Sequence, residues 1–427
     1  MTAEDSDPFL YPNAFDPGGA SVGVSRRRLL AGGATAGAVA TAGCMGGNGG
    51  DGGDDTAQDS TVFVFNTGDG TVSLLDPERD EVVETRAVGL SSSFPSNQYS
   101  PRLTDDPGDS LWLNVDRGVR GLSVGSLSET ASVGTGSGAN WLERTPDGNH
   151  VLVSAREPSH TQFRIDADPA SGTFGTVTAE IDRTPEGGHG DRDGPGPCDV
   201  TVHPDGQYAY VPDLFGDTLT VLRVDPFEIV TQIEVEPVGD GSARPWMATA
   251  SPDGGTLLVE HDEGETGTES IWDLGDPANP EERARLTAAD GLGGRPLTNE
   301  IGPDSERGYV FTPGTNDVTV VDLTAETVTG RIDLGGSAFV GTWNPSRTKL
   351  YVPVQTNDEV AVIDHEREEV VERIDVGPSP YGATSARVRP EGDPAAGLFL
   401  AMARLGIGTE APETTYCIGN CACGHRL

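Results

Sequence analysis

The chain has 427 residues and contains 68 Asp and Glu against 28 Lys and Arg, so its formal net charge at pH 7 is −40. A protein that binds nucleic acid through the phosphates carries a basic patch or stripe, and this sequence has none. Composition and charge therefore argue against nucleic acid as a partner.

Residues 1–43 are expected to direct export. Ser25-Arg26-Arg27-Arg28 precedes a weakly apolar run of Ala, Gly and Thr at 31–42, which is too short for a membrane span of about 20 apolar residues. Paired arginines before a soft apolar stretch resemble a twin-arginine signal. Thr41-Ala42-Gly43-Cys44 resembles a lipobox, in which cleavage leaves Cys44 as a lipid-bearing N-terminus. We therefore expect a protein anchored through Cys44 to the outer face of the cell membrane.

Residues 44–60 are rich in Gly and Asp and have almost no apolar side chains to bury, so a flexible tether is expected before residue 61. The acidic excess resembles that of proteins from extremely halophilic archaea. Such a charge repels itself at low salt, but at molar salt the Debye length falls to about 3 Å and the repulsion is screened.

The body of the chain, 61–404, repeats one unit. Its clearest copy is 196–235, in which four short apolar or alternating runs are separated by Pro-Asp-Gly and Gly-Asp turn signals. Four strands in about 40 residues, repeated along a chain, are typical of a β-propeller blade.

A Pro-Asp-Gly turn marks each copy. It occurs at Pro146, Pro204 and Pro252, weakens at Pro303, Pro345 and Pro390, and diverges at 106–108. Because the aspartates recur at a fixed place in the unit, we interpret them as turn formers and not as catalytic carboxylates.

The second strand of each unit has a Tyr-Val or Leu-Val core, as in Tyr210-Val211-Pro212-Asp213 and Tyr351-Val352-Pro353-Val354. These residues resemble the YVTN family of β-propeller repeats, and the resemblance extends from 61 to about 402. It implies an all-β propeller with blades of four antiparallel strands. It implies little about function, because the matching residues are turn and core positions.

The two ends of the body complete one blade. Residues 61–89 supply a second, third and fourth strand, whereas 380–389 supply a first strand with no complete blade after it. Pairing these segments closes the ring, and with six repeats between them it gives seven blades. The apolar stretch 397–404 competes for the place of a second strand, so eight blades remain the alternative.

Residues that enter the first strands ring one mouth of a propeller channel. Six residues before each landmark proline, or at the matching place, the sequence has Asn140, Cys198, Trp246, Leu297, Phe339 and Tyr381, with Trp141 adjacent to Asn140. Two interpretations stay open. These side chains either plug the channel for packing, or they form a shallow pocket for an apolar or planar ligand or for a partner protein's side chain.

Other motifs that carry chemistry are missing from the sequence. It has no ring of histidines at the expected mouth, no Cys-x-x-Cys-His haem attachment and no phosphate loop.

The C-terminal tail is the other candidate site. A polar spacer that begins at residue 405 leads to Cys417, Cys421, Cys423 and His425. Three thiolates and one imidazole suit zinc or Cu(I). In an exported protein, the three thiols and Cys198 could instead form disulfides. A tail with no defined role is the third possibility.

Three functions follow from these features. We expect a non-enzymatic binding or scaffold protein at the cell surface, with a protein or small molecule bound at the propeller face. The alternative is a metal-handling (copper or zinc) or redox accessory protein that uses the tail. The third is a propeller enzyme of the lactonase or oxidoreductase type.

Overall fold

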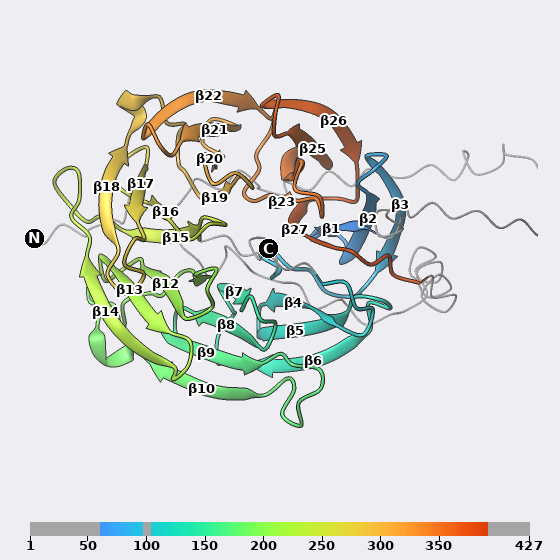
Figure 1. Ribbon diagram of the computed structural model, residues 1–427, viewed down its shortest axis with the longest axis horizontal. Helices are drawn as coiled ribbons and strands as arrows, with labels where there is room; N and C mark the ends of the chain where they lie inside the picture. Colours follow the sequence, from blue (N-terminus) through green and yellow to red (C-terminus); the bar gives the residue numbers. More distant parts are fainter. Residues whose placement is uncertain (1–59, 97–103, 392–427) are drawn as a thin grey trace, which may run out of the picture. The chain divides into compact units, whose positions relative to one another are not determined.

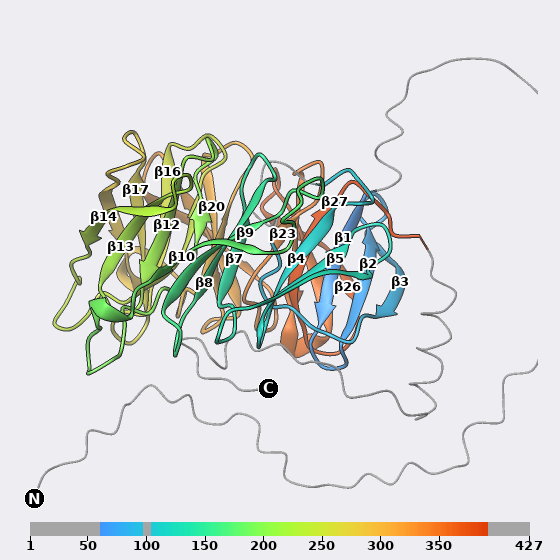
Figure 2. The same cartoon turned by 90° about the horizontal axis from the view of Figure 1, so that it is seen from below.

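The computed structural model describes residues 60–96 and 104–391. In these residues seven antiparallel sheets surround a common axis and form a seven-bladed β-propeller. Figure 1 looks down this axis, with the outermost strand of each blade at the periphery, and Figure 2 shows the same blades edge-on. The expectation of seven blades is confirmed over the alternative of eight.

Each blade is built from consecutive strands, ordered from the channel outward. Blade 1 contains β27 (Pro380–Ala386), β1 (Thr61–Asn66), β2 (Thr71–Asp76) and β3 (Glu81–Ala87). Blade 2 contains β4 (Ser110–Val115), β5 (Gly118–Ser123) and β6 (Glu129–Gly134). Blade 3 contains β7 (Trp141–Arg144), β8 (His150–Ala155), β9 (Thr161–Asp166) and β10 (Val177–Asp182). Blade 4 contains β11 (Thr201–Val202), β12 (Tyr208–Asp213), β13 (Thr218–Arg223) and β14 (Glu228–Glu234). Blade 5 contains β15 (Pro245–Ala250), β16 (Thr256–His261), β17 (Thr268–Asp273) and β18 (Glu281–Leu286). Blade 6 contains β19 (Thr298–Ile301), β20 (Arg307–Thr312), β21 (Asp317–Asp322) and β22 (Thr327–Asp333). Blade 7 contains β23 (Thr342–Trp343), β24 (Lys349–Val354), β25 (Glu359–Asp364) and β26 (Glu369–Asp375). Short 3-10 helices occur at η1 (Thr184–Glu186), η2 (Ala288–Asp290) and η3 (Gln355–Asn357).

The ring closes as the sequence predicts. Strand β27, from the end of the described chain, pairs antiparallel with β1 from its beginning, and Thr61 lies opposite Ala386. Both strands are completely buried, so the first and last segments of the propeller share one sheet and its core.

Blade 2 departs from the regular pattern. Its described residues form three strands, and the place next to β4 is taken by the segment Ser92–Ser96, whose Ser96 N–H donates to the carbonyl of Trp112. The Asn114 side-chain carbonyl accepts bonds from the N–H groups of Ser93 and Phe94 and so holds this segment in place.

The core lies between neighbouring blades. One apolar cluster joins Val62 and Val64 of blade 1 to Tyr351 and Val362 of blade 7. Burying an aliphatic side chain of this size contributes about 1.5–3 kcal/mol. Inner strands are therefore apolar on both faces, whereas an outermost strand such as β14 alternates between exposed and partly buried residues.

The tyrosine of the second-strand Tyr-Val core links three of the blades to the next blade. Tyr210 Oη donates to the carbonyl of Pro277 in blade 5 (3.1 Å), and Tyr351 Oη donates to the carbonyl of Pro77 in blade 1 (3.3 Å). Tyr309 repeats this arrangement with His365, whose Nδ1 lies 2.7 Å from the hydroxyl. Both partners of each bond are at least partly buried, so removing a hydroxyl leaves a carbonyl unsatisfied, at a cost of about 1–3 kcal/mol.

The landmark aspartates close turns. Asp147 accepts bonds from the Thr145 hydroxyl and the Asn149 N–H, and Asp253 repeats this in blade 5. The following Gly148 has φ +78°, a left-handed conformation that glycine adopts without strain. These carboxylates therefore serve the turns, as the repeat pattern predicts.

Candidate functional site

The structure brings the predicted rim residues together at one end of the channel. One buried cluster contains Trp141, Cys198, Trp246, Leu297 and Tyr381, and Phe339 packs against it. The rings of Phe339 and Tyr381 stack with centroids 4.9 Å apart. All but Phe339 are buried, so these side chains fill the channel mouth as a plug and leave little surface for a ligand.

Two details differ from the sequence pattern. Blade 3 contributes Trp141 to the cluster, whereas the amide of Asn140 donates to the carbonyl of Cys198 and lies 3.1 Å from its Sγ. Blade 2 contributes Phe94, whose ring lies 4.2 Å from that of Trp141 and 5.8 Å from that of Tyr381. The sequence pattern did not predict Phe94, because the divergent landmark of blade 2 gave no register. The adjacent Pro95 was the available signal.

Below the plug, polar side chains connect each first strand to the next. The Glu143 carboxyl accepts the N–H of Val202 (2.8 Å), and Asp199 accepts the N–H of Ala248 (2.7 Å). In the same way the Thr298 hydroxyl donates to the carbonyl of Phe339. First strands have a free edge toward the channel, and these side chains satisfy it.

Several carboxyl groups in this layer are fully buried. Burial raises the pKa of Glu143 to about 8, although the Val202 and Thr201 hydrogen bonds oppose the shift. Burial also raises the pKa of Asp199 and Glu300 well above the usual range, and the nearby Glu143 adds to both shifts. Burial therefore favours the protonated form of all three carboxyl groups, and that of Glu143 keeps its proton around neutral pH.

A cavity of about 540 Å³ lies on the same face as the plug, beside blade 4. It is lined by Glu186, Gly187, Gly188, His189, Pro195, Phe215, Gly216, Thr218 and Gln232. Phe215 also belongs to the plug cluster, so the apolar side of this cavity is continuous with the plug. Half of the lining comes from the Gly/Asp-rich segment 185–197, which the sequence indicates only as a loop.

Arg183 holds this loop in position. Its guanidinium is fully buried and forms a two-pronged ion pair with Asp213, at 2.6 and 2.9 Å. It also donates to both carboxylate oxygens of Glu186, at 2.8 and 2.7 Å. Although partial burial opposes ionisation, Arg183 and the Gln232 amide lower the pKa of Glu186, so an ionised carboxylate lines the cavity.

His189 is the accessible imidazole of this cavity. Its side chain is 63% exposed, and its Nε2 lies 3.2 Å from a carboxylate oxygen of Asp217. Asp217 is held in turn by the Ser242 hydroxyl (2.7 Å) and the Arg244 N–H (2.8 Å). An exposed imidazole within ion-pair distance of a fixed carboxylate is a candidate general base.

Arg192 lies beside the cavity. Its guanidinium stacks on the Phe215 ring at 4.4 Å from the centroid. It also lies 3.6 Å from the Glu157 carboxylate and remains 45% exposed. A cation held over an aromatic ring is positioned to attract negative charge that develops on a bound ligand.

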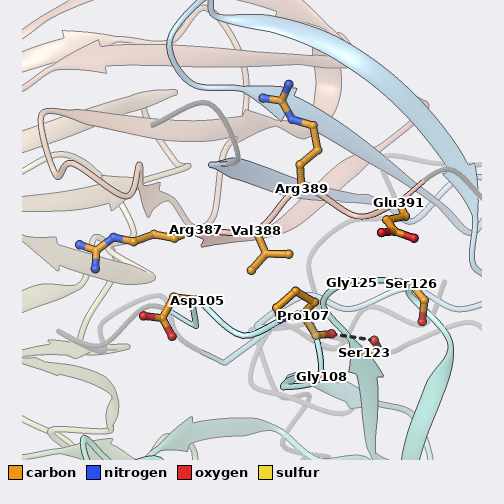
Figure 3. A pocket seen from close by; sticks show the side chains of 10 residues that line it. All are labelled: Asp105, Pro107, Gly108, Ser123, Gly125, Ser126, Arg387, Val388, Arg389 and Glu391. Carbon is orange, nitrogen blue, oxygen red and sulfur yellow. Dashed lines mark hydrogen bonds between the residues drawn. The ribbon is translucent and has the colours of Figure 1, made fainter. Parts of the chain in front are cut away.

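A second cavity, of about 630 Å³, lies between blades 1 and 2 on the opposite face. Figure 3 shows that its two arginines, Arg387 and Arg389, point in different directions. Arg389 pairs with Asp76 at 2.9 Å, which neutralises it. The Asp105 and Glu391 carboxylates also line this second cavity and add negative charge. The cavity therefore offers neither a cluster of cationic side chains that would bind an anion nor an oriented general base.

Two other histidines of the described propeller, His203 and His261, serve the fold. His203 Nε2 lies 3.1 Å from the carbonyl of Gly254 in the next blade, and His261 is fully buried against Ala243 and Ser270. In the residues that the structure describes, no group of three or more His, Cys, Asp or Glu side chains is arranged for a metal ion. Cys44 and the tail residues Cys417, Cys421, Cys423 and His425 lie outside the described residues. Over 60–96 and 104–391 no helix has the length and apolar character needed to cross a membrane.

These features define the class of the protein as a seven-bladed β-propeller with a plugged channel and a lateral cavity. No family model and no curated protein matches the sequence. Solved structures do match, with coverage of about three quarters of this chain. The Pseudomonas aeruginosa periplasmic gluconolactonase is 16% identical with a TM-score of 0.60, and the match covers 77% of this chain and 99% of the other.

Two further matches extend the comparison. A proposed 6-phosphogluconolactonase from Bacteroides fragilis is 17% identical with a TM-score of 0.60, over 78% of this chain and 99% of that one. Hydrazine synthase from Kuenenia stuttgartiensis is 15% identical with a TM-score of 0.55, over 72% and 93%. At these identities the likeness shows the propeller fold, which unrelated activities share.

Proposed function

We propose that the protein is a lactonase-type hydrolase that opens a small polar lactone in the cavity beside blade 4. The observation that carries this proposal is the exposed His189 imidazole, oriented by Asp217 at the cavity wall. Two of the matched structures, named as a gluconolactonase and as a proposed 6-phosphogluconolactonase, support the choice of reaction class.

The residues of the cavity take distinct roles in this reaction. His189 Nδ1 accepts a proton from water while the water oxygen attacks the lactone carbonyl carbon. Arg192 stabilises the negative charge on the carbonyl oxygen. The bond between the carbonyl carbon and the ring oxygen then breaks, and the proton passes from His189 to that ring oxygen, which yields a hydroxy acid. Asp217 is a positioning residue, because it acts on the reaction through the imidazole.

The non-enzymatic function expected from the sequence depended on the rim residues. In the structure they are buried, so they offer a ligand less than the cavity at His189 does. A binding module is therefore the second candidate.

The test is hydrolysis of glucono-δ-lactone by the full chain at high salt, followed as acid release above the spontaneous rate. His189→Ala should reduce kcat by about 10²–10⁴-fold, the usual contribution of a positioned base. Asp217→Asn should lower kcat with little change in KM, which a merely structural role would not produce. His150→Ala is the matched control, because His150 begins β8 on the opposite face. If the His189→Ala and wild-type rates agree for every lactone tested, the proposal is wrong and the binding module is favoured.

We also propose, from the sequence alone, that the chain is exported and anchored through Cys44. Mass spectrometry of the mature N-terminus should find a lipid on Cys44, and Cys44→Ser should release the protein from the membrane. Elemental analysis with thiol titration separates metal binding by the tail from disulfides. About one zinc or copper per chain, lost in a Cys417→Ser/Cys421→Ser variant, would support metal binding.

A further inference from the structure

Two glutamates face each other inside blade 5. Glu260 of β16 and Glu269 of β17 are direct partners in the antiparallel register, so their side chains lie on the same face of the sheet. Neither has any exposed surface. Like charges directly opposite in a sheet destabilise it, so this pair needs a compensating group.

An asparagine from the neighbouring blade points at both carboxyl groups. Asn299 of β19 is 1% exposed, and its side-chain Nδ2 donates to Glu260 Oε1 at 2.9 Å and to Glu269 Oε1 at 3.2 Å. The other oxygen of each group, Glu260 Oε2, Glu269 Oε2 and Asn299 Oδ1, has no hydrogen-bond partner among the residues that the structure describes. Three unsatisfied oxygens on three touching side chains point to a missing ligand, because buried polar groups are nearly always satisfied.

The neighbouring residues of the described propeller do not supply the missing charge. The closest basic group that acts on Glu269 is Arg285, but its guanidinium bonds to Glu263 (2.9 Å) and Glu282. Both nitrogens of the adjacent His261 are engaged, with the Ala243 carbonyl and the Ser270 hydroxyl. Burial raises the pKa of both Glu260 and Glu269, and their mutual repulsion raises that of Glu269 further. Neutralisation must therefore come from protons or from a bound cation.

We propose that Glu260, Glu269 and Asn299 bind a hard divalent cation, of the Ca²⁺ type, between blades 5 and 6. Ca²⁺ takes carboxylate and side-chain amide oxygens, and two carboxylates balance its charge. A bound cation would also be coordinated by the three oxygens that lack a hydrogen-bond partner, whereas protons on the carboxyl groups alone would leave some of these oxygens without one. Rotation of the Asn299 amide presents Oδ1 in place of Nδ2, so the chain offers oxygen from three strands and two blades. The surroundings described above provide no thiolate and no available imidazole, which disfavours zinc and copper.

The test uses the full chain, freed of metal by a chelating resin and held in 2 M KCl. High salt is needed because a chain of net charge −40 binds divalent ions diffusely at low ionic strength. Titration with CaCl₂ should show about one saturable site per chain and a rise in melting temperature. Glu260→Gln and Glu269→Gln should each weaken binding by about 100-fold or abolish it, as expected when one charge of a compensated buried group is removed.

Two variants guard against a folding artefact. Asn299→Asp adds a third carboxylate, so it should tighten Ca²⁺ binding in folded protein. Glu143→Gln neutralises a buried carboxyl of blade 3 and should leave Ca²⁺ binding unchanged. Wild-type protein without a saturable site, or a site unchanged in Glu260→Gln and Glu269→Gln, would overturn the proposal. Stability that depends on pH through Glu260 but not on Ca²⁺ would also overturn it, since protons alone would then neutralise the pair. The lactonase assay is independent of these outcomes.

Discussion

The substitution Glu143→Gln should make the propeller less sensitive to rising pH. Glu143 is buried in β7, and burial raises the pKa of its carboxyl from the usual 4.5 to about 8. A carboxyl whose pKa is raised by folding holds its proton in the folded state and loses it in the unfolded state. The folded state then binds more protons between pH 4.5 and 8, so stability falls as pH rises through that window.

The magnitude follows from the width of the window. Each pH unit costs about 1.4 kcal/mol for one such group, so between about pH 5.5 and 7.5 Glu143 removes about 3 kcal/mol. If about 330 residues unfold as one cooperative unit, this corresponds to about 4 °C in melting temperature. Glutamine keeps an acceptor for the Val202 N–H but cannot ionise, so the variant should lose about 4 °C less than wild type over the same range.

Differential scanning calorimetry in 2 M salt across this pH range measures the effect. Glu281→Gln on the exposed β18 is the matched control, because it makes the same substitution at a surface position. Equal pH slopes for wild type and Glu143→Gln would refute the idea that burial sets the protonation of this carboxyl. A flatter slope for Glu281→Gln as well would assign the effect to net charge.

Three further predictions test the scaffold. Tyr351→Phe removes the hydroxyl that bonds to Pro77 and Asp80 of blade 1. The free energy of unfolding, measured by chemical denaturation, should therefore fall by about 1–3 kcal/mol. An unchanged value would mean that this hydrogen bond does not stabilise the contact between the two blades. Phe94→Ala empties part of the plug against Trp141 and should cost about 3–5 kcal/mol, whereas a cost below about 1 kcal/mol would mean that the mouth is loosely packed. Below roughly 0.5 M salt the melting temperature should decrease, because the repulsion within a chain of net charge −40 is no longer screened. A melting temperature that is independent of salt would contradict the halophile interpretation.

The repeat made most of the fold predictable. Once Pro204-Asp205-Gly206 set the register of one blade, the same spacing located the strands of the other blades and the pairing of the two ends. The plug residues followed from the same register. Blade 2 was the exception, because its landmark had diverged and Phe94 could not be aligned.

The candidate site could not be found in the same way. His189 and Asp217 lie 28 positions apart in two loops. They meet because the Arg183 ion pairs and the backbone bonds of His189 and Pro195 to Phe215 fold the 185–197 segment over blade 4. A loop conformation that depends on such long-range contacts leaves no periodic signal in a sequence. The segment could be recognised as a loop, but its shape could not be predicted.

Buried carboxyl groups explain why polar residues in the first strands are poor guides to activity in this fold. Each first strand has an unpaired backbone edge toward the channel, and Glu143 and Asp199 satisfy such an edge on the next blade. A carboxyl group that accepts a hydrogen bond from a backbone N–H stabilises the fold, so its presence is explained without a catalytic role. Within the described chain, Glu260 and Glu269 have no such partner on their second oxygens, although they are buried as completely. Glu300 Oε1 also lacks a partner there, but Glu260 and Glu269 lie opposite each other in the sheet and share the Asn299 amide. This pairing is what singles them out as a cation site.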